Sequence, residues 1–535
     1  MKSRVLTLCV VILVCFEPAS AQSSPYVPNL DPAYSDLDAL VAVGLVEVPS
    51  MAQRPYSRMA FARFVTEARA KWGDSGLDPA RFIEALSRLE ERFSDEVLAV
   101  CQGGEEICRP VQPQLRLTQA SVDVASASSP RRPIRTPHST SSRVDGDINP
   151  LLQGNQGRIL ADGQTIGVET TLNAQLGPRF AAQLRPRAWA GRGDEVELEG
   201  ITLLDGYLRG MLGGFAIEAG RINISRGHAR EGGALLSHNA RGLDLVRVMR
   251  ERPLRLPWIF GAIGSITGSA WLADMGPDRT FPHSKLIGLE LGVRPARALE
   301  FGVMLLNHQG GEGAPAATLR ERFRDLFPPV GPIAISDRVV VGDMRVTLTG
   351  LDLYGSVLTT DADFTPVGWR LRESWWVEAV WTVGARRVGL GSGGRMDAWI
   401  EARRAGTRTH THHQFLKGMT IDRRLIGDPL GPLATALQAG LDWTGSVDVV
   451  RLSGAWELYS GDDWEELPHP RHYTRISDNP DEIRLRATLD WSRDLEGTDF
   501  RTTVRLGYEH VTRFNFTDEN RSNYLAQVKL AWIPN

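Results

Sequence analysis

Polar side chains that could bind a ligand gather in one glycine-rich stretch, residues 220–242, which reads GRINISRGHAREGGALLSHNARG. His228, Asn239 and Arg241 supply an imidazole, an amide and a guanidinium, and all three groups form hydrogen bonds. Glycine lets a backbone come close to other groups and adopt positive φ angles. The stretch therefore predicts either a long ordered loop or a binding surface.

A second group of polar residues is the cluster His410, His412 and His413, in the segment TRTHTHHQF. Histidine is the commonest metal ligand, and His410 and His412 would share one face of a strand. The neighbouring sequence supplies no acidic or cysteine partner that would complete a metal site. We expect a polar cluster that faces a lumen or pore, without a bound metal or cofactor.

Acidic residues surround a tryptophan in residues 460–466, SGDDWEE. Two carboxylates that flank a sugar, here those of Asp463 and Glu465, are the arrangement of a glycosidase. Adjacent acidic residues in a loop between strands are more often simply solvated, and the chain has no GxSxG or HExxH motif. The sequence favours a protein that is not an enzyme, with a surface glycosidase as an alternative.

Most of the chain alternates between apolar and polar residues, which is the period of a β-strand. In residues 483–491 and 524–532, apolar side chains occupy every second position and mostly polar ones lie between them. The pattern continues over roughly 420 residues from Gln114 without a helical period, which is too long for one soluble sandwich. Several apolar faces end in Trp or Tyr, as the aromatic girdle of a membrane barrel requires.

These strands predict a mainly β protein, a large antiparallel transmembrane β-barrel of about 18 strands with long loops over residues 111–535. A soluble propeller is the alternative, but no repeat of the length of a propeller blade is visible. After the first 21 residues the chain has no apolar run of about 18 residues, and this excludes a transmembrane helix but not a barrel. A net charge of −3 argues against nucleic-acid binding.

The N-terminal region predicts export followed by helices. A basic start, an apolar run and the pattern Ala19-Ser20-Ala21 are typical of a secretory signal peptide, residues 1–21. Residues 22–110 place apolar side chains at helical spacing, and they predict a small helical domain with its own core. Cys101 and Cys108 are the two cysteines that remain after the signal, and in an oxidising compartment we expect them to form a disulfide.

Four segments, taken in order, resemble the capsule assembly protein Wzi family of bacterial outer-membrane barrels. After the helical start comes SRGHAREGGALLSHNARG, then LPWIFG, then KLIGLELGVRPARALEFGVMLLNHQGGEG, which is similar to a strand pair of that family ending in a Gly-rich loop. The later segment HHQFLKGMTIDRRLIGDPLGP looks like a glycine-rich region of the family in its C-terminal third. The resemblance spans nearly the whole mature chain.

The resemblance implies an outer-membrane barrel with a periplasmic helical part, which binds capsular or extracellular polysaccharide as a lectin and attaches it to the cell surface. Other implied partners are outer-membrane lipids and lipopolysaccharide, with peptidoglycan as a further candidate, and a monomer is expected. An open porin or transporter for small solutes or saccharides is the alternative function. The expected polysaccharide-binding residues are His228, Asn239, Arg241, His412, His413 and Asp428. The competing hypothesis is that these residues hold loops inside the barrel as a plug.

Overall fold

The structure of the chain is a computed structural model that describes residues 22–73, 80–100, 112–128, 130, 132–136, 142–193, 197–326, 335–360, 377–468 and 471–534. The expected signal peptide, residues 1–21, lies outside these residues, as does the expected disulfide between Cys101 and Cys108.

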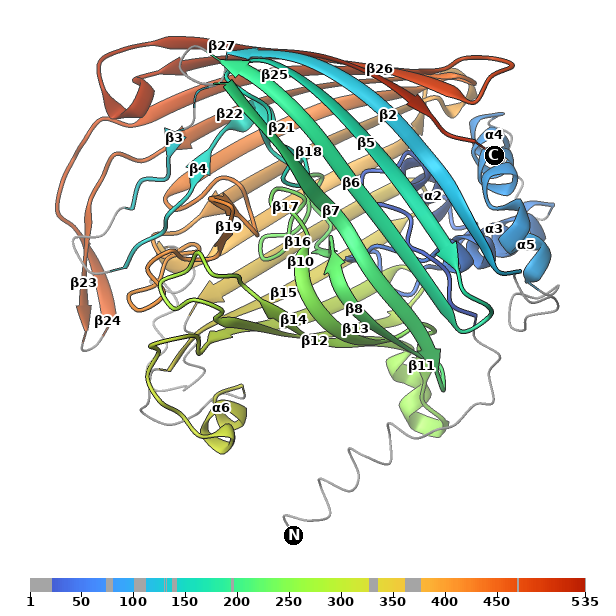
Figure 1. Cartoon of the computed structure of the whole chain (residues 1–535), viewed down its shortest axis with the longest axis horizontal. Coiled ribbons are helices and arrows are strands. Elements are labelled where there is room, and N and C mark those ends of the chain that lie inside the picture. The colour runs from blue at the N-terminus through green and yellow to red at the C-terminus, as the bar shows by residue number, and fades with distance from the viewer. Residues whose placement is uncertain are drawn as a thin grey trace.

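A closed antiparallel barrel of 18 strands forms the bulk of the described chain (Figure 1). Neighbouring strands pair in chain order, and the barrel closes where Val124 of the first strand pairs with Val528 of the last. The predicted fold and strand number are confirmed. The strands are β2 (Gln114–Ser128), β5 (Gly163–Gln175), β6 (Phe180–Gly193), β7 (Glu197–Leu212), β8 (Phe215–Ile222), β10 (Leu243–Arg250), β12 (Ser265–Asp274), β13 (Lys285–Ala296), β14 (Leu299–Gln309), β15 (Ser336–Leu348), β16 (Leu351–Thr360), β17 (Val380–Leu390), β18 (Met396–Ala405), β21 (Ala434–Thr444), β22 (Asp448–Tyr459), β25 (Glu482–Asp494), β26 (Phe500–Thr512) and β27 (Arg521–Trp532).

The strand period sorts side chains between the outside and the inside of the barrel. On β27, Val528 and Leu530 point outward and are 52% and 46% exposed. On β25, Leu485 is likewise exposed, whereas its neighbour Arg484 is buried in the lumen. An apolar outer surface and a polar interior are the arrangement of a barrel that spans a bilayer. Among the described residues, none of the helices combines the length and apolar character needed to cross a membrane.

Ion pairs between strands neutralise the charged lumen. Glu218 on β8 accepts hydrogen bonds from Arg209 on β7 at 2.9 Å and from Arg247 on β10 at 2.7 Å. Arg187 on β6 reaches across β5 to Asp123 on β2, with one contact at 3.0 Å. A buried charge that lost its partner would be strongly destabilising, so these pairs fix the side chains that line the wall.

The two ends of the barrel have different connections. At one end the strands are joined mostly by short turns, such as residues 213–214 and 349–350. The other end carries the long connections, among them residues 223–242 and 406–433. Short strand pairs lie outside the wall, in the connections and, for β1, in the N-terminal region. They are β1 (Gln53–Arg54) with β9 (Ser225–Arg226), β3 (Arg132–Pro133) with β4 (Asp147–Ile148), β19 (Thr420–Ile421) with β20 (Arg424–Leu425), and β23 (Trp464–Pro468) with β24 (Arg471–Arg475).

In the described part of the N-terminal region, four helices cover the short-turn end (Figure 1). Ser57 caps the second of them by accepting a hydrogen bond from the Ala60 N–H. Their apolar faces form a common core, which Val388 of the barrel joins. Arg81 holds this helical unit to the barrel by donating hydrogen bonds to Asp397 in a buried ion pair. The helices are α2 (Ala33–Ala42), α3 (Arg58–Trp72), α4 (Ala80–Arg92) and α5 (Ser94–Ala99).

Candidate functional site

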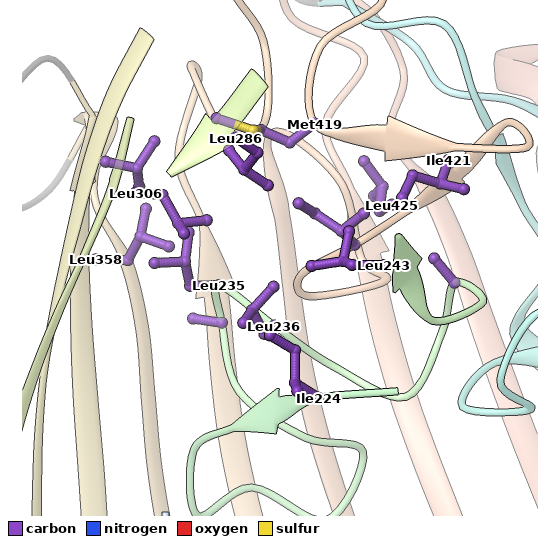
Figure 2. Close-up of a cluster of buried hydrophobic side chains, with 14 of the residues drawn as sticks. Ile224, Leu235, Leu236, Leu243, Leu286, Leu306, Leu358, Met419, Ile421 and Leu425 are labelled. Atoms are coloured by element: carbon purple, nitrogen blue, oxygen red, sulfur yellow. The ribbon is translucent and has the colours of Figure 1, made fainter. Parts of the chain in front are cut away.

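Two long connections fold into the barrel and pack against its inner wall. We call these connections, residues 223–242 and 406–433, the plug. Leu235 and Leu236 of the first connection are almost fully buried, together with Met419 and Leu425 of the second. Figure 2 shows these side chains meeting Leu286, Leu306 and Leu358 of the wall. Their burial removes a large apolar area from water, and this stabilises both connections inside the lumen.

Backbone contacts join the two connections of the plug. The Ser237 N–H donates to the carbonyl of Ile426 at 2.8 Å, and the Asp428 N–H donates to the carbonyl of Ala234 at 3.0 Å. At Gly233, a Cβ would lie 1.4 Å from the carbonyl oxygen of Arg226, so only glycine fits there. The glycines in this stretch therefore serve close packing of the backbone.

Ion pairs fasten the plug to the barrel wall. Arg226 donates to Asp343 of β15 at 2.8 Å, and Arg230 donates to Asp442 of β21 at 2.8 Å. The β9 strand of the plug also pairs with β1, which links it to the N-terminal helical unit. The plug is thus held from the wall and from the short-turn end together.

Of the three residues expected from the first stretch, two lie inside the barrel. The side chain of His228 is 4% exposed, and its Nε2 lies 3.4 Å from the Asp343 carboxylate. Asn239 is also buried and donates from its amide to the carbonyl of Leu425 at 3.0 Å. Arg241 lies nearer the surface, where it donates to the exposed Asp422 at 2.7 Å.

Of the three residues expected from the later segment, one is exposed. His413 is exposed, and its ring lies 4.4 Å from the ring of the buried His412. The Nδ1 of His412 accepts from the N–H groups of Gln414 and Phe415, so it shapes the local turn. Asp428 is buried and accepts from Arg403 on β18 at 2.9 Å. Burial raises the pKa of Asp428, against the opposing effect of Arg403.

The plug contains two histidines whose burial favours the neutral form. Burial lowers the pKa of His238 from 6.5 to about 4, with a smaller contribution from Arg54. Burial alone lowers the pKa of His410 from 6.5 to about 4. Both rings are therefore neutral at physiological pH, and acid would charge them in place.

Asp462 and Asp463 of the acidic cluster at 460–466 are held by hydrogen bonds and ion pairs to other parts of the chain. Asp463 accepts from the Arg135 guanidinium at 2.7 Å, and its backbone N–H donates to Ser477 at 2.6 Å. Asp462 forms an ion pair with Arg475 at 2.8 Å. No group of three or more His, Cys, Asp or Glu side chains that could hold a metal occurs in the described part of the chain.

Parts of three connections at the long-loop end form one outer surface, which we call the loop surface: residues 142–147, 278–283 and 412–424. The last of these segments is the outer part of the second connection of the plug. The Asp145 N–H donates to the carbonyl of Lys417 at 3.3 Å, and the Lys417 N–H donates to Thr280 at 3.2 Å. Arg423 donates to Asp147 at 2.9 Å. These contacts hold three segments, distant in the sequence, as one ordered polar surface.

The exposed groups of the loop surface include residues that the sequence reasoning missed. The side chain of Asp278 is 85% exposed and pairs with Lys417, and that of Arg423 is 43% exposed. Both lie in connections between strands, and the long barrel loops are where ligand-binding groups concentrate. Their location in long loops could have identified them from the sequence, but several other charged loop residues share that location.

Comparison with known protein families identifies the family of this barrel. The model of the family described as capsule assembly protein Wzi matches residues 133–523. The chain belongs to the capsule assembly protein Wzi family. With its closed wall and apolar exterior, this Wzi-family chain is an outer-membrane β-barrel. No curated protein matches the chain.

Solved structures agree with the fold. The chain is similar to Wzi of Escherichia coli, described as an outer membrane protein involved in group 1 capsule assembly and a carbohydrate-binding β-barrel. The identity is 15%, the match covers 95% of this chain and 99% of that one, and the TM-score is 0.67. OccD1 (OprD) gives 9% identity over 79% of this chain and 95% of that one, with a TM-score of 0.41. That TM-score is too low to support an argument about this chain.

Proposed function

We propose that this Wzi-family barrel binds capsular or extracellular polysaccharide on its loop surface and attaches it to the cell. The observation that carries the proposal is the rigid loop surface above a lumen that the plug occupies. Long loops of outer-membrane barrels face the outside, so this surface meets a polymer at the cell exterior. The relative from Escherichia coli, which is described as binding carbohydrate, shares the fold.

The chemistry of the loop surface suits an oligosaccharide. His413 presents an exposed ring, and Arg423 and Lys417 present donors that are already held by carboxylates. Fixed side chains lose little conformational entropy on binding, which favours many weak hydrogen bonds to hydroxyl or acidic groups. A repeating polymer can engage several barrels at once, so modest affinity at each site suffices for attachment.

The buried residues expected to bind polysaccharide take a supporting role in this proposal. His228, Asn239 and Asp428 hold the plug beneath the loop surface. The buried His412 shapes the turn that carries His413, and Arg241 lies where the plug meets solvent. His413 keeps a direct binding role. In this proposal the protein is a lectin and not a hydrolase, because the Asp463 carboxylate accepts a hydrogen bond from Arg135 and the Asp463 N–H donates to Ser477.

The remaining proposed partners are inferred from the two ends of the barrel and from its outer wall. We propose that residues 22–110 form a periplasmic unit and residues 111–535 the barrel, after removal of residues 1–21. The apolar wall meets outer-membrane lipids and lipopolysaccharide, and a closed barrel has no free sheet edge that would require a second copy. The helical unit is the part that could reach peptidoglycan.

The test is binding of the detergent-solubilised protein to the purified capsular polymer of its own host. His413→Ala combined with Arg423→Ala should weaken binding at least several-fold, whereas Arg69→Ala, on the opposite end, should leave it unchanged. Unchanged binding by the double variant would reject the loop surface. A stable, large conductance in planar bilayers would favour the porin alternative, and sugar release lost in Asp463→Asn would favour the glycosidase.

A further inference from the structure

An exposed apolar segment breaks the pattern of short turns at the periplasmic end. It connects β10 to β12 and contains β11 (Leu254–Arg255) and the helical turn η2 (Trp258–Ile263). Trp258 is 93% exposed, Phe260 56% and Ile263 39%. An exposed cluster of large apolar side chains marks a surface that meets another apolar phase or partner.

The barrel wall leads directly into this segment. Leu254 of β11 pairs with Ile266 of β12, which continues the row of the wall beyond the end of β10. Further along β12, Leu272 is 47% exposed on the lipid side, and Ile266 lies on the same side at an even spacing. Figure 1 shows the helical turn, in light green beside β11, at the outer side of the barrel and away from helices α2–α5.

The segment is fixed in this place. The Gly264 N–H donates to the carbonyl of Gly261 at 2.9 Å, and Gly264 has a φ of 82°. A Cβ at Gly264 would lie 1.9 Å from the carbonyl oxygen of Arg294 at the end of β13. The end of the turn is thus held against β13.

Charge adds a second indication of what the segment meets. Arg250, Arg252 and Arg255 precede the apolar run. Glu251, the acidic residue among them, is engaged inside the barrel by Arg209 and Arg63. Of the three arginines, Arg255 is exposed, whereas Arg250 and Arg252 are half-buried and the Nε of Arg252 is buried. The exposed charge next to the helical turn is therefore that of Arg255, which suits anionic phospholipid headgroups.

We propose that η2 is an interfacial anchor, which inserts Trp258 and Phe260 into the periplasmic leaflet of the outer membrane beside the barrel. Tryptophan prefers the membrane interface, and arginines next to an apolar segment bind anionic headgroups. The anchor fixes the depth and tilt of the barrel on its β10–β13 side. It is independent of polysaccharide binding, since it lies at the opposite end from the loop surface.

The test uses the full mature protein in nanodiscs of phosphatidylethanolamine and phosphatidylglycerol, with and without bromine on the acyl chains. The emission of Trp258 is obtained by subtracting the fluorescence emission of Trp258→Phe from that of the wild type. We expect brominated lipid to quench it by about half or more, as it quenches Trp443, which faces outward on β21. Trp72→Phe gives the control for a tryptophan inside the helical unit.

Two outcomes would overturn the anchor. Trp258 emission that iodide quenches and brominated lipid does not would place the segment in water. Emission that neither agent quenches would place it against protein. A matching charge test compares wild type with Arg255→Gln: removing phosphatidylglycerol should reduce quenching of Trp258 in the wild type only. Heat-modifiable gel mobility verifies that each variant forms the barrel.

Discussion

Arg403, on barrel strand β18, donates a hydrogen bond at 2.9 Å to Asp428 of the plug, and both side chains are at least 97% buried. This contact joins an inserted connection to the wall in a place that water does not reach. An ion pair in such a place is more important for fixing a single arrangement than for net stability, because both charges lose their hydration. It is therefore a point at which the plug can be released selectively.

Asp428→Asn should loosen the plug. The change removes this partner and leaves Arg403 with Glu231 and Glu401, each at 3.5 Å. Because these partners remain, we expect a cost of about 1–3 kcal/mol. We expect larger and more frequent conductance events in planar bilayers and faster proteolysis within residues 406–433, with the barrel intact. Asp422→Asn, whose side chain is 63% exposed, is the matched control and should behave as the wild type. Equal conductance of both variants would contradict the anchoring role of Asp428.

Gly233→Ala should disturb the same plug through sterics alone. Its Cβ would lie 1.4 Å from the Arg226 carbonyl oxygen, so the backbone of residues 223–242 must shift. The control is Gly73→Ala, where a Cβ meets nothing within 4 Å. We expect increased conductance and weaker polysaccharide binding for Gly233→Ala only. Normal behaviour of that variant would show that the plug tolerates rearrangement.

The plug should open in acid. His238 and His410 have pKa values of about 4 in the folded protein and 6.5 when unfolded, so below pH 6.5 the unfolded state binds more protons. Their contribution is complete above pH 6.5 and is lost as the pH falls toward 4, by about 3 kcal/mol for each histidine. Conductance recorded from pH 7.5 to pH 4 should rise in this window.

Histidine variants test that assignment. The double change His238→Gln and His410→Gln removes both titrating groups, so its conductance should depend much less on pH in the same range. His413→Gln removes an exposed histidine and should keep the pH dependence of the wild type. A pH response that persists in the double variant would assign the opening to other groups.

Arg81→Met should weaken the attachment of the helical unit. The change removes the hydrogen bonds to Asp397, while Arg386 still donates to that carboxylate at 2.7 Å. Because one partner remains, we expect a cost of about 1–3 kcal/mol, seen as faster trypsin cleavage between residues 22 and 110. Arg69→Met removes an exposed pair with Glu90 and should cost about 0.5 kcal/mol or less. Equal cleavage of the two variants would contradict the docking role.

The alternation of apolar and polar residues was sufficient to predict the barrel. Along β27, the side chains of Val528 and Leu530 lie outside and that of Lys529 lies inside, as a period of two requires. The strand number followed from the length of that pattern. Such predictions succeed because the strand period is a local property of the sequence, and the bilayer favours an apolar side chain at every second position.

The sequence could not decide which loop residues face a ligand. His413 and Asp428 are polar residues of one connection, yet one is exposed and the other buried against Arg403. Asn239 bonds to Leu425, which lies 186 residues away. Burial of a loop side chain depends on contacts between distant segments, and no local pattern encodes them. The amino-acid sequence determined the wall, and the tertiary structure decided which polar residues pack the plug and which remain on the loop surface.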